Sequence, residues 1–320
     1  MAQIFVTRRL PGPALDRLSA RHEVEIWPER LPPAADRLAE HARDADGLLS
    51  TISDRIDARL IDACPNLKAI ANYAVGYDNV DVAAATRLGI LVGNTPDVLT
   101  DATADLAFTL MLAGARRLLE ACATVTNGTW DTWDPRGVLG RAVNGKTLGI
   151  IGAGRIGRAV AKRASGFDME VLLSARPGTD PDAPPQHDGR TPIPDVLRRS
   201  DFVSVHLPLD DHTHHLIDAE ALALMRPTAI LVNTARGPIV DQRALAAALH
   251  QGTIGGAALD VTDPEPLAPD DPLLQAPNLI VAPHIGSATH EAREQMAELS
   301  VDNLLAALEG KPMPHAVNRP

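Results

Sequence analysis

The sequence predicts an α/β protein of two doubly wound domains, each a parallel sheet with helices on its faces. Short apolar runs alternate with segments of helical periodicity, as they do when helices join the strands of a parallel sheet. The 320 residues are too many for one ordinary core and suit two domains. Only 3% of the residues are aromatic, so the core must consist of Ala, Val, Leu and Ile, which favours buried strands over an all-β sandwich.

The first hundred residues predict five strands and four helices. The strands are short apolar runs at Gln3–Thr7, Val24–Trp27, Gly47–Ser50, Leu67–Asn72 and Ile90–Val92. The helical patterns between them are Pro13–Ala20, Ala34–Ala45, Ile56–Ala63 and Val80–Leu88. A long helix is expected next, from Asp101 to about Val125 with Thr100 as its N-cap. Its length and many alanines suit a domain connector or a dimer face.

A second alternating series begins at Lys146. Its predicted strands are Thr147–Ile151, Glu170–Leu173, Phe202–His206, Ala229–Asn233, Gly256–Asp260 and Leu279–Ala282. The segment Thr179–Pro194, rich in Pro, Gly and Asp, predicts a surface loop. The last helix, Thr289–Leu308, has no strand after it, so we expect it to pack on the first half. Residues 1–99 and 288–320 would then form a discontinuous substrate-binding domain, and residues 100–287 the dinucleotide-binding domain.

Charge and hydropathy exclude several classes of function. The net charge of −11 argues against nucleic acid as a partner. No apolar run reaches the ~18 residues that would span a membrane, and the first ten residues resemble a strand more than a signal peptide. We therefore expect a cytoplasmic protein without a membrane partner.

The cysteines and the clustered histidines do not predict a metal site. Cys64 and Cys122 form no spacing motif, and both are interpreted as packing residues. His212, His214 and His215 lie together, but no Cys, Asp or Glu set completes a metal site, so a solvated helix start is expected.

A glycine-rich turn follows the strand Thr147–Ile151. Its residues are Gly152, Ala153, Gly154, Arg155, Ile156 and Gly157, and the helix Arg158–Ala164 comes next. Between a strand and a helix, this G-x-G-x-x-G pattern predicts a dinucleotide site of the Rossmann or flavodoxin-like type. The first glycine permits the turn, the second lets the pyrophosphate approach the backbone, and the third lets the helix pack closely. The helix N-terminus then offers N–H groups to the phosphates.

The end of the next strand indicates which cofactor is preferred. Enzymes that use NAD place Asp or Glu there to bind the ribose hydroxyls, whereas this strand ends in Ser174, Ala175 and Arg176. The Arg176 guanidinium can pair with the 2′-phosphate of NADP, and Ser174 can add a hydroxyl donor. We therefore predict NADP as cofactor, with NAD as the alternative. The alternative for Arg176 itself is an ordinary solvated surface charge.

Three polar residues follow three successive predicted strands of the second half. They are Arg236, Glu265 and His284. Ligands of doubly wound sheets bind at the carboxyl ends of the strands, so these side chains are expected to share one cleft. Hydride transfer to a keto carbon leaves an oxygen that needs a proton, which a histidine can donate. A carboxylate orients the imidazole, and an arginine neutralises a substrate carboxylate and polarises the carbonyl. The set predicts reduction of a small anionic 2-keto acid, or oxidation of the 2-hydroxy acid.

Nearly the whole chain resembles the D-isomer-specific 2-hydroxyacid dehydrogenases, most of all the glyoxylate/hydroxypyruvate reductases. The most specific stretches are residues 71–79, residues 94–105 and Leu259–Ala288. The resemblance implies two α/β domains around an interdomain cleft, a homodimer formed through the cofactor domain, and Arg236, Glu265 and His284 as the catalytic set. It further implies that Val75 and Gly76 bind the substrate carboxylate. The implied cofactor contacts outside the turn are Thr103, Thr234, Asp260 and Gly286.

One stretch departs from these reductases. They have a Trp-x-Pro-x-Trp segment whose second Trp reaches the neighbouring subunit's pocket, whereas this chain has Trp133, Pro135 and then Gly137. A roomier pocket is implied, so larger keto acids such as 2-ketogluconate stay open as substrates.

Two other enzyme activities and one non-enzymatic function occur on this scaffold. Phosphite dehydrogenase chemistry is an alternative, whereas Glu265 argues against a formate dehydrogenase. From another class, a non-enzymatic NAD(H)-sensing corepressor is a further alternative, although the chain has no long disordered extension for docking a partner.

Overall fold

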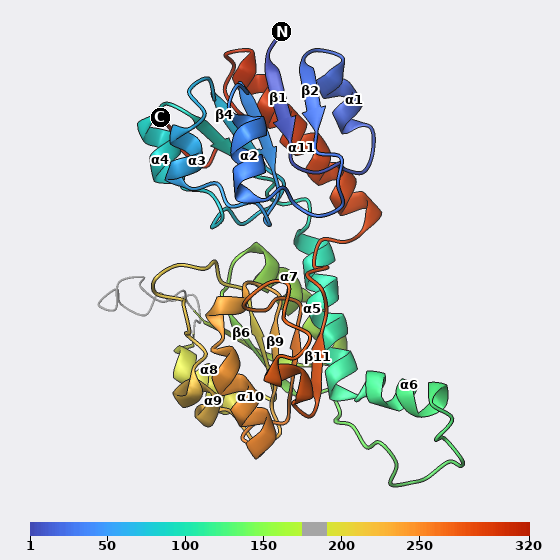
Figure 1. The fold of residues 1–320 in the computed structure, drawn as a ribbon. Coiled ribbons are helices and arrows are strands. Elements are labelled where there is room, and N and C mark those ends of the chain that lie inside the picture. The colour runs from blue at the N-terminus through green and yellow to red at the C-terminus, as the bar shows by residue number, and fades with distance from the viewer. Residues whose placement is uncertain (175–190) are drawn as a thin grey trace. The chain divides into compact units, whose positions relative to one another are not determined.

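The chain folds into two compact units, each built around one parallel sheet (Figure 1). The computed structural model describes residues 1–174 and 191–320. The first unit consists of Met1–Leu99 and Ser287–Pro320, and the second of Thr100–Gly286. The predicted class, two α/β domains with parallel sheets, is confirmed.

The first unit has five parallel strands in the order β2-β1-β3-β4-β5, which is a flavodoxin-like order. The strands are β1 (Gln3–Val6), β2 (Glu23–Ile26), β3 (Gly47–Ser50), β4 (Ala69–Asn72) and β5 (Leu91–Gly93). Every residue of β3 and β4 is buried, as expected of central strands with helices on both faces.

Helices cover both faces of this sheet. One face packs on α2 (Ala35–Ala42), α3 (Ala58–Asp62) and α4 (Val82–Arg87), around a core that includes Phe5, Leu48 and Ile70. α11 (His290–Leu308) packs on β3, β4 and β5 and contacts α1 (Ala14–Ser19). The side chain of Thr289 caps α11 by accepting from the N–H of Ala292. The last helix therefore belongs to the same unit as the N-terminal residues.

The second unit has six parallel strands in the order β11-β10-β9-β8-β6-β7. They are β6 (Thr147–Ile151), β7 (Glu170–Ser174), β8 (Phe202–Val205), β9 (Ile230–Asn233), β10 (Gly256–Leu259) and β11 (Leu279–Val281). The direction of the strand order reverses between β6 and β8. Ligands of such sheets bind at this switch point, outside the carboxyl ends of the strands.

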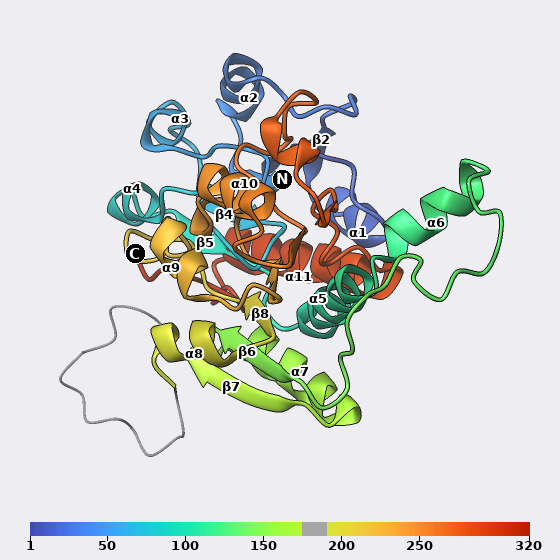
Figure 2. The ribbon, with the colours of Figure 1, turned by 90° about the horizontal axis from the view of Figure 1, so that it is seen from below.

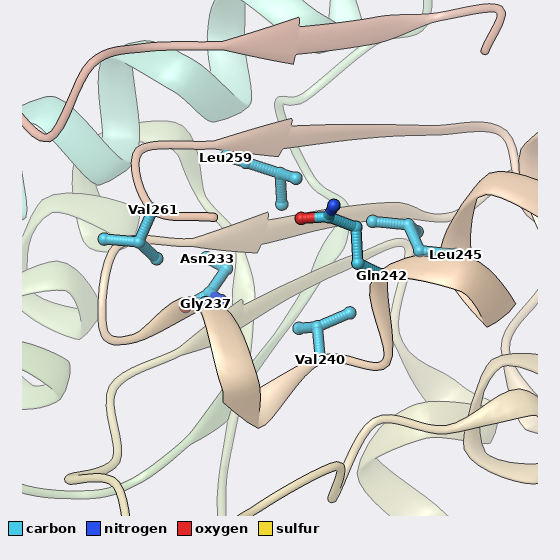
Figure 3. Close-up of a pocket in the computed structure, with 7 residues that line it drawn as sticks. All are labelled: Asn233, Gly237, Val240, Gln242, Leu245, Leu259 and Val261. Carbon is cyan, nitrogen blue, oxygen red and sulfur yellow. The ribbon is translucent and has the colours of Figure 1, made fainter. Parts of the chain in front are cut away.

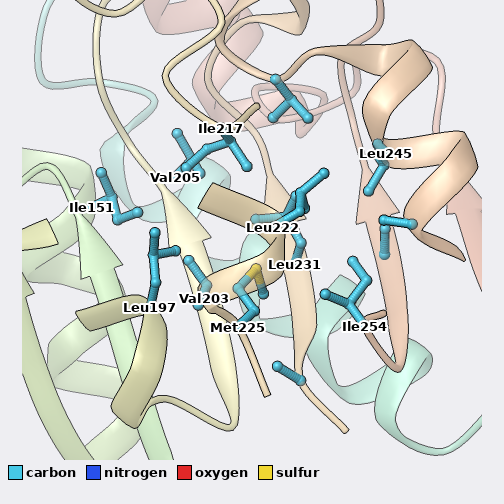
Figure 4. Packing of buried hydrophobic residues seen from close by; sticks show 14 of the residues in the cluster. Ile151, Leu197, Val203, Val205, Ile217, Leu222, Met225, Leu231, Leu245 and Ile254 are labelled. Atoms are coloured by element: carbon cyan, nitrogen blue, oxygen red, sulfur yellow. The ribbon is translucent and has the colours of Figure 1, made fainter. Parts of the chain in front are cut away.

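Alternate residues of these strands face different helices. α5 (Thr100–Ala115) and α7 (Arg155–Ala164) pack with Leu148 and Ile150 on one face. α8 (Ile193–Arg199), α9 (Ala219–Leu224) and α10 (Gln242–Gln251) contribute to the core on the other face. Figure 2 shows α7 and α8 on opposite sides of β6. Figure 4 shows Val203 and Val205 of β8 in this core. Each large apolar side chain fully buried here contributes roughly 1.5–3 kcal/mol.

The single long helix expected after Thr100 is wrong. α5 already includes Thr100 and ends at Ala115, and α6 (Leu118–Thr126) begins after Arg117, whose φ of 49° is left-handed. The N–H of Arg141 donates to the carbonyl of Ala115 at 2.7 Å, so a segment distant in sequence satisfies the end of α5. Helical periodicity continues across this break and gives no sign of it.

The structure differs from the predictions for Cys122 and for the clustered histidines, and the predicted loop Thr179–Pro194 lies mostly outside the described residues. Cys64 is buried as expected, but Cys122 is exposed, so the interpretation of Cys122 as a packing residue is wrong for the single chain. The three clustered histidines are exposed as expected, yet they lie in a turn, because α9 begins only at Ala219. Of the predicted loop Thr179–Pro194, residues 179–190 lie outside the described residues, and Ile193 and Pro194 already belong to α8. None of the helices in the described ranges could cross a membrane.

Candidate active site

The glycine turn after β6 has the geometry of a dinucleotide site. Gly152 has a φ of 107°, and a Cβ there would lie 2.5 Å from the carbonyl oxygen of His206. A Cβ on Gly157 would lie 2.1 Å from the carbonyl oxygen of Gly152, so α7 meets the turn only because this residue is glycine. A Cβ on Gly154 would meet nothing within 4 Å. No side chain caps the N-terminus of α7, so the turn offers backbone N–H groups and space for a pyrophosphate.

The structure describes the positions of three of the predicted cofactor-binding residues around this turn, but not of the fourth. Arg155 and Ile156 form the first turn of α7. Ser174 is fully buried, and its Oγ accepts from the N–H of Gly152 at 3.4 Å, so its visible contact supports the turn. Arg176, the residue expected at the 2′-phosphate, lies outside the described residues. Whether Ser174 and Arg176 bind a 2′-phosphate stays a prediction.

A buried hydroxyl near this strand edge also fits a bound cofactor. Thr234 follows β9 and is 8% exposed, yet within the described ranges its Oγ1 has no hydrogen-bond partner. A buried polar atom without a partner is costly, and a ligand atom can satisfy it. Thr103 of α5 instead donates its hydroxyl to the carbonyl of Gly286 at 3.2 Å. The glycine turn and Thr234 together fit a dinucleotide cofactor.

Arg236 lies in the loop after β9, and hydrogen bonds from neighbouring residues hold this loop in a tight conformation. The Asn233 side chain accepts from the N–H of Ala235 at 3.0 Å and donates to the carbonyl of Arg236 at 2.8 Å. A Cβ on Gly237 would lie 2.0 Å from the carbonyl oxygen of Thr262. The loop after β9 therefore touches the loop after β10, and this contact requires glycine at position 237.

Glu265 and His284 form a direct pair at the ends of adjacent strands. Nδ1 of His284 lies 2.7 Å from Oε2 of Glu265, and Oε1 of Glu265 accepts from the N–H of Thr262 at 3.1 Å. The His284 side chain is 26% exposed. Nε2 of the imidazole has no hydrogen-bond partner among residues 1–174 and 191–320. One ring nitrogen is therefore held by a carboxylate, while the other is available to a substrate.

Asp260 holds the loop that carries His284. Its two carboxylate oxygens accept from the N–H groups of Ile285 and Gly286, each at 2.7 Å, and its carbonyl accepts from the N–H of His284 at 2.9 Å. Asp260 is 1% exposed, and this burial raises the pKa of its carboxyl, against the opposing effects of these N–H bonds and of His284. The contact of Asp260 with the nicotinamide stays a prediction, whereas its hydrogen bonds to the loop of His284 are present in the structure.

The sequence-based interpretation missed two positioning residues, Asn233 and Gln242. Gln242 begins α10, accepts from the N–H of Asp263 at 3.1 Å and donates to Asp271 at 3.3 Å. Both residues line a small pocket between β9, β10 and α10, drawn in Figure 3. Asn233 could have been found in the sequence, because it is a polar residue at the end of an apolar strand. Nothing in the sequence indicates the role of Gln242.

The predicted site residues therefore fall into two groups. In the second unit the structure brings Glu265 and His284 together and joins the Arg236 loop to theirs through Gly237. Val75 and Gly76 lie in the first unit, in the loop after β4, and their contact with a substrate stays a prediction. Within the described ranges, no three His, Cys, Asp or Glu residues form a group that could hold a metal ion.

The dinucleotide turn and the carboxylate–imidazole pair at neighbouring strand ends are the features of a nicotinamide-dependent dehydrogenase. The family model described as "D-isomer specific 2-hydroxyacid dehydrogenase, NAD binding domain" matches residues 108–286. The chain belongs to the D-isomer specific 2-hydroxyacid dehydrogenase family.

Curated relatives match the chain over its whole length. A glyoxylate reductase of Thermococcus kodakarensis is 49% identical, and the match covers 99% of this chain and 96% of the relative. A glyoxylate reductase of Korarchaeum cryptofilum is 46% identical with the same coverage.

Solved structures agree with this family. A Thermus thermophilus protein superposes with a TM-score of 0.91 and 48% identity, and the match covers 99% of this chain and all of that chain. The NADPH-dependent glyoxylate/hydroxypyruvate reductase of Sinorhizobium meliloti, in complex with NADP and malonate, has a TM-score of 0.83 and 33% identity. That match covers 99% of this chain and 96% of the other.

Proposed function

We propose that this protein reduces a small 2-keto acid to its 2-hydroxy acid: glyoxylate to glycolate, which is achiral, or hydroxypyruvate to D-glycerate. The observation that carries the proposal is the Glu265–His284 pair at 2.7 Å, which leaves Nε2 without a partner in the described part of the chain. The names and full-length similarity of the glyoxylate reductases support the choice of substrate.

The acid–base chemistry follows from this pair. When bound, the reduced nicotinamide supplies a hydride to the keto carbon. The keto oxygen then needs a proton, and protonated His284 donates it from Nε2. Glu265 accepts a hydrogen bond from Nδ1, so it fixes the orientation of the ring and stabilises the imidazolium before transfer. His284 is neutral afterwards and regains a proton from solvent.

Arg236 supplies the positive charge that an anionic substrate requires. We assign its guanidinium to the substrate carboxylate and to the keto oxygen, where it stabilises the developing negative charge. The tight loop built by Asn233 and Gly237 supports this assignment, because it restricts the position of the arginine backbone. Val75 and Gly76 are assigned to the same carboxylate through their N–H groups.

We propose NADP as the preferred cofactor, with NAD as the alternative. β7 ends in Ser174, and the next two residues in the sequence are Ala175 and Arg176, so these positions lack the Asp or Glu that would repel a 2′-phosphate. The choice of NADP is supported by a relative, the Sinorhizobium meliloti reductase, whose structure contains NADP.

We also propose that the protein is a homodimer, formed through the segment 118–139 of the second unit. No residue of α6 is buried in the single chain. Large apolar side chains are exposed along the segment: Leu118, Leu119, Val125, Trp130, Trp133 and Leu139. Apolar surface of this kind is typical of an interface, and a second copy of the chain would remove it from water.

A panel of substrates tests the activity. Glyoxylate, hydroxypyruvate, pyruvate and 2-ketogluconate are each assayed with NADPH and with NADH, and the glycerate formed from hydroxypyruvate is analysed on a chiral column. We expect the fastest turnover with glyoxylate or hydroxypyruvate and NADPH, and D-glycerate as product. Faster turnover of 2-ketogluconate would favour the larger substrate that Gly137 allows. Binding of NADPH without turnover of any keto acid would instead favour a sensor protein.

A further inference from the structure

Three successive carbonyl groups in the loop after β4 are bound by the protein itself. The carbonyl of Ala74 accepts from the N–H of Thr95 at 2.9 Å. The carbonyl of Val75 accepts from Nδ2 of Asn94 at 2.8 Å, and that of Gly76 accepts from Nδ2 of Asn72 at 3.0 Å. The direction of each peptide group in this loop is therefore set by a named donor.

These contacts determine where the N–H groups of the loop point. The peptide bonds of the loop are trans, so each N–H points opposite to the carbonyl of the same peptide group. Asn94 and Thr95 are neighbours and hold two successive carbonyls, so the N–H groups of Val75 and Gly76 both point away from them. Within the described ranges, the N–H groups of Val75, Gly76 and Tyr77 have no acceptor. Successive N–H groups on one side of a backbone form a concave site for an anion.

A pair of asparagines fixes the two ends of this loop. Nδ2 of Asn72 donates to Oδ1 of Asn79 at 3.0 Å, and Nδ2 of Asn79 donates to Oδ1 of Asn72 at 3.2 Å. Nδ2 of Asn79 also donates to the carbonyls of Thr51 and Asp54, at 3.0 and 2.9 Å. Asn72 is fully buried, so these bonds are protected from water. The loop is thus organised before any ligand arrives.

The backbone of Asn94 is held independently of its side chain. Its N–H donates to the carbonyl of His315 at 3.2 Å, and its carbonyl accepts from Nδ2 of Asn303 at 2.9 Å. Replacing the Asn94 side chain should therefore free the Val75 carbonyl while leaving the segment after β5 in place.

We propose that Asn94 is a positioning residue, which holds the N–H groups of Val75 and Gly76 in the direction in which both can bind a carboxylate. This inference rests on the proposed function, because the carboxylate is that of the 2-keto acid. Asn94 does not touch the substrate; it prevents the peptide group between Val75 and Gly76 from turning over. The ligand class is a planar carboxylate, which accepts several N–H donors at once.

The test compares Asn94→Ala and Asn94→Ser with the full-length wild-type enzyme. The serine hydroxyl is too short to replace the amide, and it keeps the site polar in case the alanine variant does not fold. The measurements are KM and kcat for glyoxylate, the Kd of NADPH, and the Kd of oxalate on the NADPH-loaded enzyme by calorimetry. We expect the KM and the oxalate Kd to rise about tenfold, with kcat within about twofold of wild type, because carboxylate binding is equal in the ground and transition states. The Kd of NADPH should not change.

Asn318→Ala is the matched control. Asn318 is another buried asparagine of the same unit, which accepts from the N–H of Val92 and donates to the carbonyl of Ile90, both at 2.8 Å, without touching the loop. Its replacement should lower the melting temperature and leave KM unchanged. An unchanged KM in both Asn94 variants, or an equal rise in the Asn318 variant, would overturn the inference. If the wild-type enzyme reduces no 2-keto acid, the proposed function fails, and the oxalate titrations still decide whether Asn94 organises an anion site.

Discussion

Two histidines of the second unit have different hydrogen-bond partners. His284 is paired with Glu265 at 2.7 Å and is partly exposed, so its protonated form has a partner. His206 follows β8 beside the glycine turn, and its Nε2 lies 2.8 Å from Oγ of Ser204. Burial lowers the pKa of His206 to about 4, so this ring is neutral near pH 7. Of these two histidines, only His284 is paired with a carboxylate, which can stabilise a protonated ring.

Replacing His284 should remove the proton donor without disturbing the cofactor. We expect His284→Ala to lower kcat by about 10²–10⁴-fold, the usual contribution of a general acid, with an NADPH Kd close to that of wild type. Stopped-flow or steady-state assays with glyoxylate measure the first, and fluorescence titration the second. His250→Ala, at an exposed position of α10, is the control. Turnover as fast as wild type would remove His284 from the mechanism.

His206 should make the second unit sensitive to acid. Its pKa is lower in the folded than in the unfolded protein, so between about pH 6.5 and 4 the unfolded chain binds the proton and stability falls as the pH falls. Lowering the pH from 7.5 to 5 should therefore cost about 2 kcal/mol through this residue. By calorimetry, the melting temperature of wild type should fall about 4–8 °C further than that of His206→Gln over this range. Equal shifts would show that His206 titrates normally.

Arg176 tests the preference for NADP. An aspartate at this position would repel the 2′-phosphate and accept hydrogen bonds from the ribose hydroxyls of NAD. We expect Arg176→Asp to shift the ratio of kcat/KM for NADPH over NADH by at least about tenfold toward NADH. Arg198→Asp, on the exposed surface of α8, controls for the change of net charge. If the two variants have the same ratio, the 2′-phosphate interpretation of Arg176 is wrong.

At the scale of elements, the contact between the loops after β9 and β10 decides the position of Arg236 relative to the loop of Glu265. A methyl group at position 237 would overlap the carbonyl of Thr262, and neither backbone segment can yield as a flexible side chain would. We expect Gly237→Ala to lower kcat/KM for glyoxylate at least about tenfold and to destabilise the second unit by about 1–3 kcal/mol. Gly166→Ala, where a Cβ meets nothing within 4 Å, is the control. Normal kcat/KM in Gly237→Ala would show that this contact is dispensable.

At the scale of the whole molecule, the exposed segment 118–139 decides the oligomeric state. Light scattering should give about 68 kDa for wild type, twice the 34.0 kDa of the chain. Leu119→Glu together with Val125→Glu places two charges on the apolar surface of α6, and we expect this variant to elute as a monomer. Leu88→Glu, an equally exposed leucine of the first unit, should stay dimeric. A wild-type monomer at micromolar concentration would contradict the proposed homodimer.

The sequence by itself determined the class of fold and the positions of several strands. β3 and β6 begin and end at the residues that the apolar runs predict, because a strand buried on both faces must be apolar along its whole length. The glycine turn was predictable for a similar reason, since only glycine fits at Gly152 and Gly157. Arg236, Glu265 and His284 were predicted as a set because each lies in the loop after one of three successive strands, and the structure pairs Glu265 with His284. The catalytic roles of these residues stay predictions.

Contacts between distant segments decided what the sequence could not show. The carbonyl of Ala115 accepts from the N–H of Arg141, and α5 ends at Ala115 although the helical periodicity continues. Asn94 orders the loop of Val75 across 19 residues of sequence, and Gln242 holds the loop of Glu265 through Asp263. Hydrogen bonds of this kind depend on which loops meet in space. Local propensity and hydrophobic spacing carry no information about them, so only the tertiary structure decides these positions.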